Sequence, residues 1–236
     1  MNDKPKSSLY LRVVSAAVLL PVVLCCLVMG KIPFIALTAA AFAISLYEWV
    51  RMARLGGHAV RDVLFGIVYL VLCFAAFIAL RLFFFEGLGL VLILALCVWA
   101  TDIGAYFTGK AVGGPKMAPA ISPNKTIAGL CGGIVSSMAI VYLYVKHIGP
   151  YLTARSDIVF SALQNASVPT VLAIGAVLAL VGQVGDLFIS MQKRRVQVKD
   201  TGSLIPGHGG ILDRIDSLLL AAPAFLALLT FLFQWR

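Results

Sequence analysis

Four aspartates, several cationic side chains and a group of glycines lie within residues 185–217, and strongly apolar sequence lies on both sides of this region. A charged group at the centre of a bilayer costs about 2.5–3.5 kcal/mol, so charge in this context marks a cavity, a pathway or a metal site. The residue types suit chemistry on phosphate, because carboxylates hold hard cations while cationic side chains and glycine amides neutralise phosphate oxygens. We therefore expect a polyphosphate site with a divalent cation in this region.

The carboxylates of the region are spaced for two helices. Asp186, Ser190 and Lys193 follow one another at i, i+4 and i+7, so a helix over 168–192 would align them on one face near its end. Asp213 and Asp216 fall in the first turns of a predicted helix over 213–235, where the helix dipole favours negative charge. Both helices can thus offer carboxylates to one cavity.

The cation expected at these carboxylates is Mg²⁺. Asp186, Asp213 and Asp216 supply hard oxygen atoms, which Mg²⁺ prefers together with water and substrate phosphates. The histidine and thiolate ligands typical of zinc do not join the pattern. Each aspartate alone has a structural alternative, an ion pair such as Asp186 with Lys193 or Asp213 with Arg214, but the complete set favours the metal site.

The loop between the two helices is basic and rich in glycine. Its cationic residues are Lys193, Arg194, Arg195 and Lys199, and its glycines include Gly202, Gly207, Gly209 and Gly210. Glycine lets main-chain amides approach an anion, and the cations neutralise phosphate. A basic cluster alone is more often a topology signal, but beside two aspartates it favours phosphate binding. His208 suits a proton carrier and a loop cap equally well.

A second polar cluster lies within residues 101–133. It contains Asp102, Tyr106, Lys110, Lys116, Ser122, Lys125 and Thr126 among several glycines. Ser122-Pro123 suggests a turn that opens a helix, whose free amides could take an anion. The alternative is a plain loop in which Gly129 and Gly133 serve close helix packing.

Two further acids stand at predicted membrane edges. Glu48 is followed by Trp49 and Arg51, which suit an interfacial anchor, and Glu86 suits the outer surface. We assign neither acid a catalytic role.

The composition is that of a polytopic membrane protein. Of 236 residues, 61% are hydrophobic and 12% are charged, and the mean hydropathy is +1.00, which excludes a water-soluble core. Lipid offers the main chain no hydrogen-bond partner, so apolar runs without period-two alternation must be helices. We predict an all-α fold with about seven spans (six to nine), at roughly 13–30, 32–50, 63–80, 84–109 (in one piece or two), 126–146, 168–192 and 213–235.

Most of the 19 lysines and arginines fall on one side of these spans. The loops around 51–62, 110–125 and 193–212 are therefore expected in the cytoplasm. The orientation of the chain in the membrane and its attraction to anionic lipid explain the net charge of +9, so no nucleic-acid partner is needed.

We also expect an uncleaved first helix and no disulfide framework. Residues 1–236 are treated as one transmembrane domain with site-forming regions at 101–133 and 185–217, and 148–167 as an external connection with an interfacial helix.

The polar residues at the end of the chain form a long motif. It runs Ser190-x-x-Lys193-Arg194, four residues, then Lys199-Asp200-x-Gly202-x-x-Ile205-Pro206-x-His208-Gly209-Gly210-Ile211-x-Asp213-Arg214-Ile215-Asp216. This closely resembles the carboxy-terminal signature of phosphatidate cytidylyltransferases, also called CDP-diacylglycerol synthases. The resemblance extends to Gly185-Asp186, to Asp102 with Gly104-Ala105-Tyr106, to Ser122-Pro123-x-Lys125-Thr126 and to Glu48-Trp49. Gln192 departs mildly from the family pattern. Ile127-Ala128 also departs from it, at positions where the family usually has an aromatic residue and often an acid, so no catalytic acid is assigned in the loop that leads to Gly129.

The resemblance implies an enzyme that joins CTP and phosphatidic acid, giving CDP-diacylglycerol and pyrophosphate for phospholipid biosynthesis. It implies catalytic roles for Asp186, Lys193, Asp213 and Asp216, with the three aspartates holding Mg²⁺ and room for a second, monovalent cation such as K⁺. It implies substrate binding by Ser122, Lys125, Thr126, Ser190, Arg194, Lys199, Asp200, His208, Gly209, Gly210 and Arg214. The expected location is a bacterial inner membrane with the site facing the cytoplasm, and a homodimer is compatible with it.

Two other functions fit parts of the pattern. A related membrane transferase could use a different lipid phosphate, such as an isoprenoid one, and assays with several lipids would separate the two. An ion-coupled transporter also places aspartates in broken helices, but its expected inverted repeat is missing from the sequence.

Overall fold

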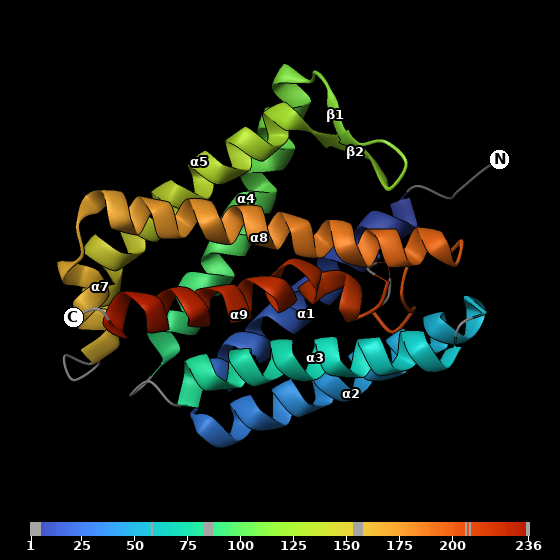
Figure 1. Cartoon of the computed structure of the whole chain (residues 1–236), viewed down its shortest axis with the longest axis horizontal. Helices are drawn as coiled ribbons and strands as arrows, with labels where there is room; N and C mark the ends of the chain where they lie inside the picture. Colours follow the sequence, from blue (N-terminus) through green and yellow to red (C-terminus); the bar gives the residue numbers. More distant parts are fainter. Residues whose placement is uncertain are drawn as a thin grey trace. The chain divides into compact units, whose positions relative to one another are not determined.

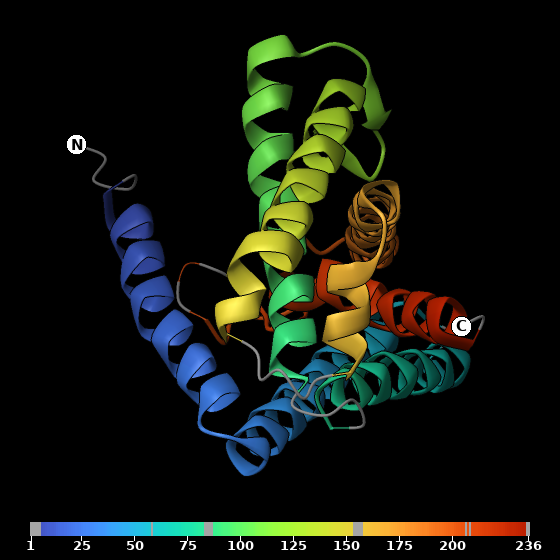
Figure 2. The ribbon, with the colours of Figure 1, turned by 90° about the vertical axis from the view of Figure 1, so that its left-hand side faces the viewer.

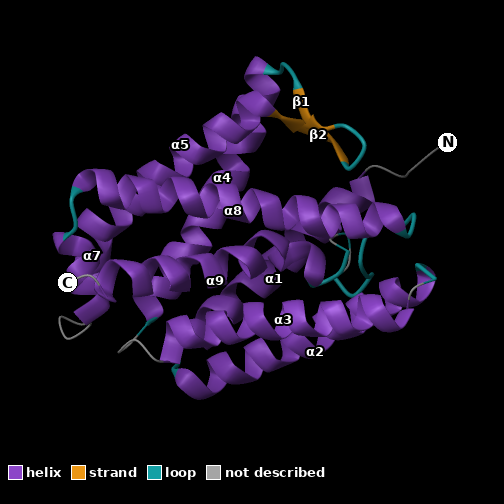
Figure 3. Ribbon diagram, in the orientation of Figure 1, coloured by secondary structure: helices purple, strands orange, loops and turns teal. Residues whose placement is uncertain are grey.

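The computed structural model is almost entirely helical (Figures 1 and 3). It describes residues 6–57, 59–82, 87–152, 158–205, 207 and 209–234. The long helices are α1 (Lys6–Val28), α2 (Lys31–Leu55), α3 (Ala59–Leu82), α4 (Leu88–Val112), α5 (Ile127–Leu143), α8 (Val168–Arg195) and α9 (Leu212–Gln234). The short elements are strands β1 (Lys116–Ala118) and β2 (Ser122–Thr126), the π-helix η1 (Tyr144–Ile148), α6 (Gly149–Leu152) and α7 (Ile158–Asn165).

Within the described ranges, 6 helical stretches are long and apolar enough to cross a membrane. They are Lys31–Leu55, Val60–Leu82, Leu88–Val112, Ile127–Tyr151, Val168–Arg195 and Leu212–Leu232, and α1 adds a shorter apolar stretch, Val13–Val28. The prediction of an all-α polytopic membrane fold is confirmed. The fourth predicted segment, left open as one piece or two, is the single helix α4.

The long external connection contains α6 and α7. Arg155 and Asp157, which suggested an interfacial helix there, lie outside the described residues, so that assignment stays a prediction.

The chain forms two compact units. Unit 1 comprises Met1–Val71 and Met191–Ile215, and unit 2 comprises Leu72–Ser190 and Asp216–Arg236. Residues of α3, α8 and α9 are divided between the two units. The single-domain organisation expected from the sequence stays a prediction.

In unit 1, the side chain of Trp49 joins α2 to α3. A Cβ atom on Gly66 would overlap the Trp49 indole, so only glycine lets α3 approach this ring. The indole Nε1 donates a hydrogen bond to the main-chain oxygen of Asp62 at 2.8 Å. The ring also lies 6.2 Å from Phe65 and 5.9 Å from Tyr69, measured between ring centroids. Aromatic packing over a glycine therefore fixes the α2–α3 pair.

In unit 2, α4 and α5 lie side by side, as Figure 2 shows in green and yellow-green. Their contact is made of glycines and small hydroxyl side chains: a Cβ on Gly133 would lie 2.9 Å from the main-chain oxygen of Thr101, and a Cβ on Gly132 would overlap Thr108. Ser137 of α5 extends the packing to α8, donating to the main-chain oxygen of Gly175 at 2.7 Å. Small residues thus allow close helix packing in a membrane protein, as the structural alternative for Gly129 and Gly133 predicted.

A short antiparallel hairpin follows α4. Strands β1 and β2 pair Lys116 with Thr126 and Ala118 with Ser122. Helix α5 begins only at Ile127, so the expectation that Ser122-Pro123 opens a helix is wrong: both residues lie in β2. The cap of α5 is Thr126, whose hydroxyl accepts a hydrogen bond from the amide of Gly129 at 3.0 Å.

Candidate functional site

The signature residues of unit 1 surround Asp213 in the first turn of α9. This residue is only 8% exposed. Its Oδ2 atom accepts three hydrogen bonds, from the amide and hydroxyl of Thr201 at 2.8 and 3.0 Å and from the amide of Gly210 at 3.0 Å. Its Oδ1 atom accepts from Lys193 Nζ at 2.6 Å. The buried carboxylate is therefore paired with a cation and held by the loop, as burial of a charge requires.

Glu48 of α2 is a second buried carboxylate of unit 1, 3% exposed. It accepts hydrogen bonds from the amides of Ile211 at 3.0 Å and Leu212 at 2.9 Å, and from the hydroxyl of Thr201 at 2.8 Å. The first amides of a helix have no partner within the helix, and its dipole attracts negative charge there. Glu48 therefore caps α9 from a distant part of the sequence and fixes where the loop ends.

The glycines of the signature make room for these carboxylates. A Cβ on Gly202 would lie 2.5 Å from Glu48 Oε1, and a Cβ on Gly210 would overlap both the Glu48 carboxylate and the Thr201 hydroxyl. Gly209 has a φ of 86°, in the left-handed region that favours glycine, and its Cβ would lie 2.9 Å from Asp213 Oδ2. These glycines are thus needed to fold the loop around the protein's own acids. Their contact with a substrate phosphate stays a prediction.

The other predicted residues of unit 1 are mostly at the surface. Arg194, Lys199, Asp200 and Arg214 are exposed. Arg194 donates to the main-chain oxygen of Val198 at 3.4 Å. The partner of Asp213 is Lys193 and not Arg214, which was the alternative considered from the sequence. His208 lies outside the described residues.

In unit 2, the described structure joins the two polar clusters of the sequence. Lys125 of β2 forms an ion pair with Asp186 of α8, with 2.5 Å between Nζ and Oδ2 and side chains 21% and 23% exposed. Ser190, one turn further along α8, donates to Asp186 Oδ1 at 3.1 Å. Residues 61 positions apart thus form one half-buried polar group. Of the stripe expected for Asp186, Ser190 and Lys193, the first two are joined by a hydrogen bond. Lys193 belongs to unit 1 and pairs with Asp213, and the partner of Asp186 is Lys125.

Helices α8 and α9 approach closely beside this group, within unit 2. A Cβ on Gly185 would lie 2.7 Å from the main-chain oxygen of Asp216, and a Cβ on Gly182 would lie 3.6 Å from Ser217. The Asp216 carboxylate accepts a hydrogen bond from the amide of Ser217 at 2.8 Å. Gly185 therefore lets the main chain at Asp216 lie close to the turn of α8 that contains Asp186.

The two remaining predictions in unit 2 concern hydroxyl side chains. Ser122 lies in β2, where it pairs with Ala118. Thr126 is 4% exposed, and its hydroxyl caps α5. A structural role thus accounts for Thr126, while contact of either hydroxyl with substrate stays a prediction.

The oxygen atoms of Asp186 and Asp213 are of the type that Mg²⁺ binds. The described residues contain no group of three or more histidine, cysteine, aspartate or glutamate side chains that could hold a metal ion. Asp186 has a partly exposed carboxylate and the Ser190 hydroxyl beside it, which is the hard-oxygen set that the ion prefers. Asp213 can serve through Oδ1, the atom now facing Lys193, because Oδ2 already accepts three hydrogen bonds. Asp186 and Asp216 belong to unit 2 and Asp213 to unit 1, so a shared ion stays a prediction.

Comparison with known proteins assigns the chain to a family. The sequence model of the cytidylyltransferase family matches residues 57–232. The chain belongs to this family. A phosphatidate cytidylyltransferase of Rickettsia bellii is 35% identical over 94% of this chain and 91% of its own length. Proteins of the same name from Bacillus subtilis and Brucella suis are 41% and 45% identical, over 71% and 58% of this chain and 56% and 45% of their own lengths.

Glu48 is part of the family resemblance, but sequence reasoning missed that it holds the signature loop. It was assigned no catalytic role, and it precedes the region that the cytidylyltransferase model matches. One signal was available: a carboxylate near the end of an apolar segment carries the same cost that drew attention to residues 185–217. The acid needed partners, and they lie more than 150 positions along the chain.

Proposed function

We propose that this chain transfers the cytidylyl group of CTP to phosphatidic acid, giving CDP-diacylglycerol and pyrophosphate. A phosphate oxygen of the lipid attacks the α-phosphorus of CTP, and the bond from that phosphorus to the oxygen bridging to the β-phosphate breaks. Membership of the cytidylyltransferase family supports the nucleotide. The names of the relatives, together with the apolar helices, support the lipid.

The observation that carries the proposal is the Lys193–Asp213 pair, buried at the amino terminus of α9 and surrounded by the signature loop. The reaction brings one anion against another, so neutralising and positioning phosphates are its main demands. Lys193 and Lys125 each lie beside an aspartate, and the exposed Arg194 and Lys199 add charge that a triphosphate can attract. No general base is needed, because the phosphatidate oxygen is already ionised near neutral pH.

We propose Mg²⁺ as the cofactor, with K⁺ as a candidate second cation. When bound, the divalent ion would neutralise the phosphates of CTP. Asp186, Asp213 and Asp216 are the proposed ligands, and Ser190 orients the Asp186 carboxylate. The two lysines would hold phosphate oxygens, and burial of Asp213 would keep water from its side of the site.

We further propose a bacterial plasma membrane as the location, with the site at the cytoplasmic surface. The basic loops 51–62, 110–125 and 193–212 support this orientation. The acyl chains of the lipid could then stay in the bilayer while its phosphate reaches the signature loop.

Purified protein in detergent, given CTP and one lipid phosphate at a time, tests the proposal. We expect CDP-diacylglycerol and an equal amount of pyrophosphate from phosphatidic acid with Mg²⁺, and none when EDTA removes the ion. Turnover of an isoprenoid phosphate in preference to phosphatidic acid would replace the lipid assignment. Turnover undiminished by EDTA would overturn the cofactor.

A further inference from the structure

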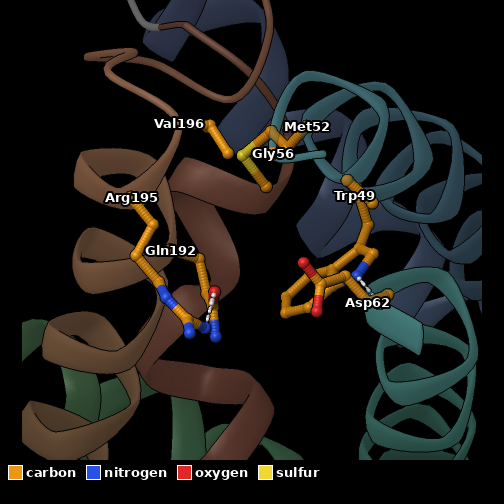
Figure 4. A pocket seen from close by; sticks show the side chains of 8 residues that line it. Trp49, Met52, Gly56, Asp62, Gln192, Arg195 and Val196 are labelled. Carbon is orange, nitrogen blue, oxygen red and sulfur yellow. Dashed lines mark hydrogen bonds between the residues drawn. The ribbon is translucent and has the colours of Figure 1, made fainter. Parts of the chain in front are cut away.

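A groove opens in unit 1 at the ends of α2, α3 and α8 (Figure 4). It has a volume of about 220 Å³ and is continued by a hollow of about 300 Å³ that shares four of its lining residues. Gln192 and Arg195 of α8 lie on one wall, and Trp49 and Asp62 lie across from them. Arg61 and Phe65 line the continuation. No function described so far uses this groove.

The wall across from Arg195 combines apolar side chains with the Asp62 carboxylate. Trp49 is 4% exposed, and its only polar atom already donates to the main-chain oxygen of Asp62. Phe65 is 51% exposed, and Leu64 and Val68 on the same helix are 59% and 58% exposed. Apolar side chains this exposed on a membrane-spanning helix suit contact with acyl chains. An apolar path therefore leads along α3 to the groove.

The facing wall, on α8, carries the positive charge of Arg195. The Arg195 guanidinium donates to the Gln192 side-chain oxygen at 3.3 Å, and no carboxylate of the described residues forms an ion pair with it. On the α3 side, Arg61 shares its charge with Asp62 at 3.4 Å, in an exposed pair. The arginines outnumber the acid, and a guanidinium hydrogen-bonded only to a neutral amide keeps its capacity for an anion.

The position of the groove matches the height of lipid headgroups. Gly56 ends α2, Asp62 lies in the first turn of α3, and Arg195 is the last residue of α8. All three are ends of membrane-spanning helices, where the bilayer surface begins. Each of the two connected hollows lies at or below the range of roughly 300–1,000 Å³ that encloses whole small ligands. Either hollow can hold a bare phosphate head.

We propose that this groove holds the phosphate of phosphatidic acid, with its acyl chains along the exposed face of α3. Arg195 takes the terminal phosphate oxygens in a two-pronged hydrogen bond, and Arg61 adds charge. A phosphomonoester offers more negative charge than the diester of other anionic phospholipids, which favours it as the occupant. Trp49 follows Glu48 in α2, so one helix lines the groove and caps the signature loop. The groove would thus collect lipid beside that loop, and this role rests on the proposed function.

Fluorescence quenching of Trp49 tests the binding without turnover. Trp99 and Trp235 are replaced by Phe, and the protein is placed in phosphatidylcholine nanodiscs without CTP or Mg²⁺. Brominated phosphatidic acid or brominated phosphatidylglycerol is then added in increasing fractions. We expect brominated phosphatidic acid to quench Trp49 at a lower fraction of the lipid than brominated phosphatidylglycerol does. Arg195→Gln should raise the fraction of phosphatidic acid needed for half-maximal quenching about tenfold, because a charge-assisted hydrogen bond is lost. Arg54→Gln, an equal charge change in the last turn of α2, should leave the curve unchanged.

Several outcomes would overturn the assignment. Equal quenching curves for Arg195→Gln and Arg54→Gln would remove Arg195 from lipid binding. Equal quenching by both lipids would remove the phosphomonoester preference. Reversal by millimolar inorganic phosphate would show a site for free anions instead of lipid.

A kinetic measurement separates this inference from the proposed function. In the wild-type background, Arg195→Gln should raise KM for phosphatidic acid several-fold and leave kcat within about twofold, because only substrate binding is lost. Absence of turnover in the wild type would refute the proposed function and leave the quenching result standing. Normal turnover with Arg195-independent quenching would refute the groove alone.

Discussion

Glu48 and Asp213 accept hydrogen bonds from the same side chain, the hydroxyl of Thr201, at 2.8 and 3.0 Å. A hydroxyl carries one hydrogen, so the two buried carboxylates share it. Each acid also accepts hydrogen bonds from main-chain amides. Glu48 binds those of Ile211 and Leu212, where the loop meets α9, and Asp213 binds those of Thr201 and Gly210 within the loop. The signature loop is therefore folded around two negative charges, only one of which has a cation beside it in the described structure.

Glu48→Gln should weaken this arrangement while keeping the size of the side chain. The new NH₂ group would face main-chain amides or the Thr201 hydroxyl, so at least one buried donor loses its acceptor. Such a loss costs about 1–3 kcal/mol. We expect a lower midpoint of thermal unfolding in detergent and a lower kcat. A variant as stable and active as the wild type would show that the carboxylate charge is not needed to hold the loop.

Gly210→Ala tests how tightly the loop encloses the acids. Its new methyl group would overlap the Glu48 carboxylate and the Thr201 hydroxyl, both fixed by hydrogen bonds, and overpacking of this kind costs about 1–3 kcal/mol. Unfolding should therefore occur at a lower temperature. Gly182→Ala is the matched control, because its nearest contact in unit 2 is 3.6 Å; there, alanine should be neutral or slightly stabilising. Equal effects of both changes would refute the close packing at Gly210.

The pairing of Lys125 with Asp186 predicts non-additive kinetics. Lys125→Met and Asp186→Asn should each lower kcat/KM by about 10²-fold or more, since each removes a positioned charge. Because the two side chains act as one group at 2.5 Å, the double variant should be close to the worse single variant. Losses that multiply in the double variant would show that the residues act independently.

Thr126 distinguishes a structural role from contact with substrate. Removing the hydroxyl that caps α5 should lower stability by about 1 kcal/mol in Thr126→Ala, and Thr126→Ser should retain it. If the hydroxyl serves only as the cap, the KM for CTP should stay unchanged in both variants. An increase in KM with stability unaltered would support the substrate contact that the family resemblance implies.

The sequence was sufficient to predict the membrane helices, because apolar length is a local property. Every one of the six long apolar stretches overlaps a predicted span. The hairpin was missed: β2 is the polar stretch Ser122-Pro123-Asn124-Lys125-Thr126, whose residues show no apolar alternation, and its proline suggested a helix start instead. Short strands held mainly by each other leave little trace in composition.

The site was predictable in its residues but not in its pairs. Asp186 and Lys125 were both named, yet their contact joins positions 61 apart, and the ion pair considered for Asp186 was with the nearer Lys193. The bond from Thr201 to Glu48 spans 153 positions. Helix periodicity aligns neighbours along one helix, whereas the packing of a strand and of a loop against distant helices decided these pairs.

The central claim, cytidylyl transfer to a lipid at Asp213, is tested most directly by following the phosphates of CTP. Protein in phosphatidic acid-containing nanodiscs with Mg²⁺ is given CTP labelled at the α- or the γ-phosphorus. We expect the α-label in the lipid fraction and the γ-label in water-soluble pyrophosphate. Asp213→Asn, folded by its thermal unfolding profile, should transfer at least about 10²-fold less α-label. Lipid carrying the γ-label, or α-label transfer undiminished in Asp213→Asn, would contradict the account.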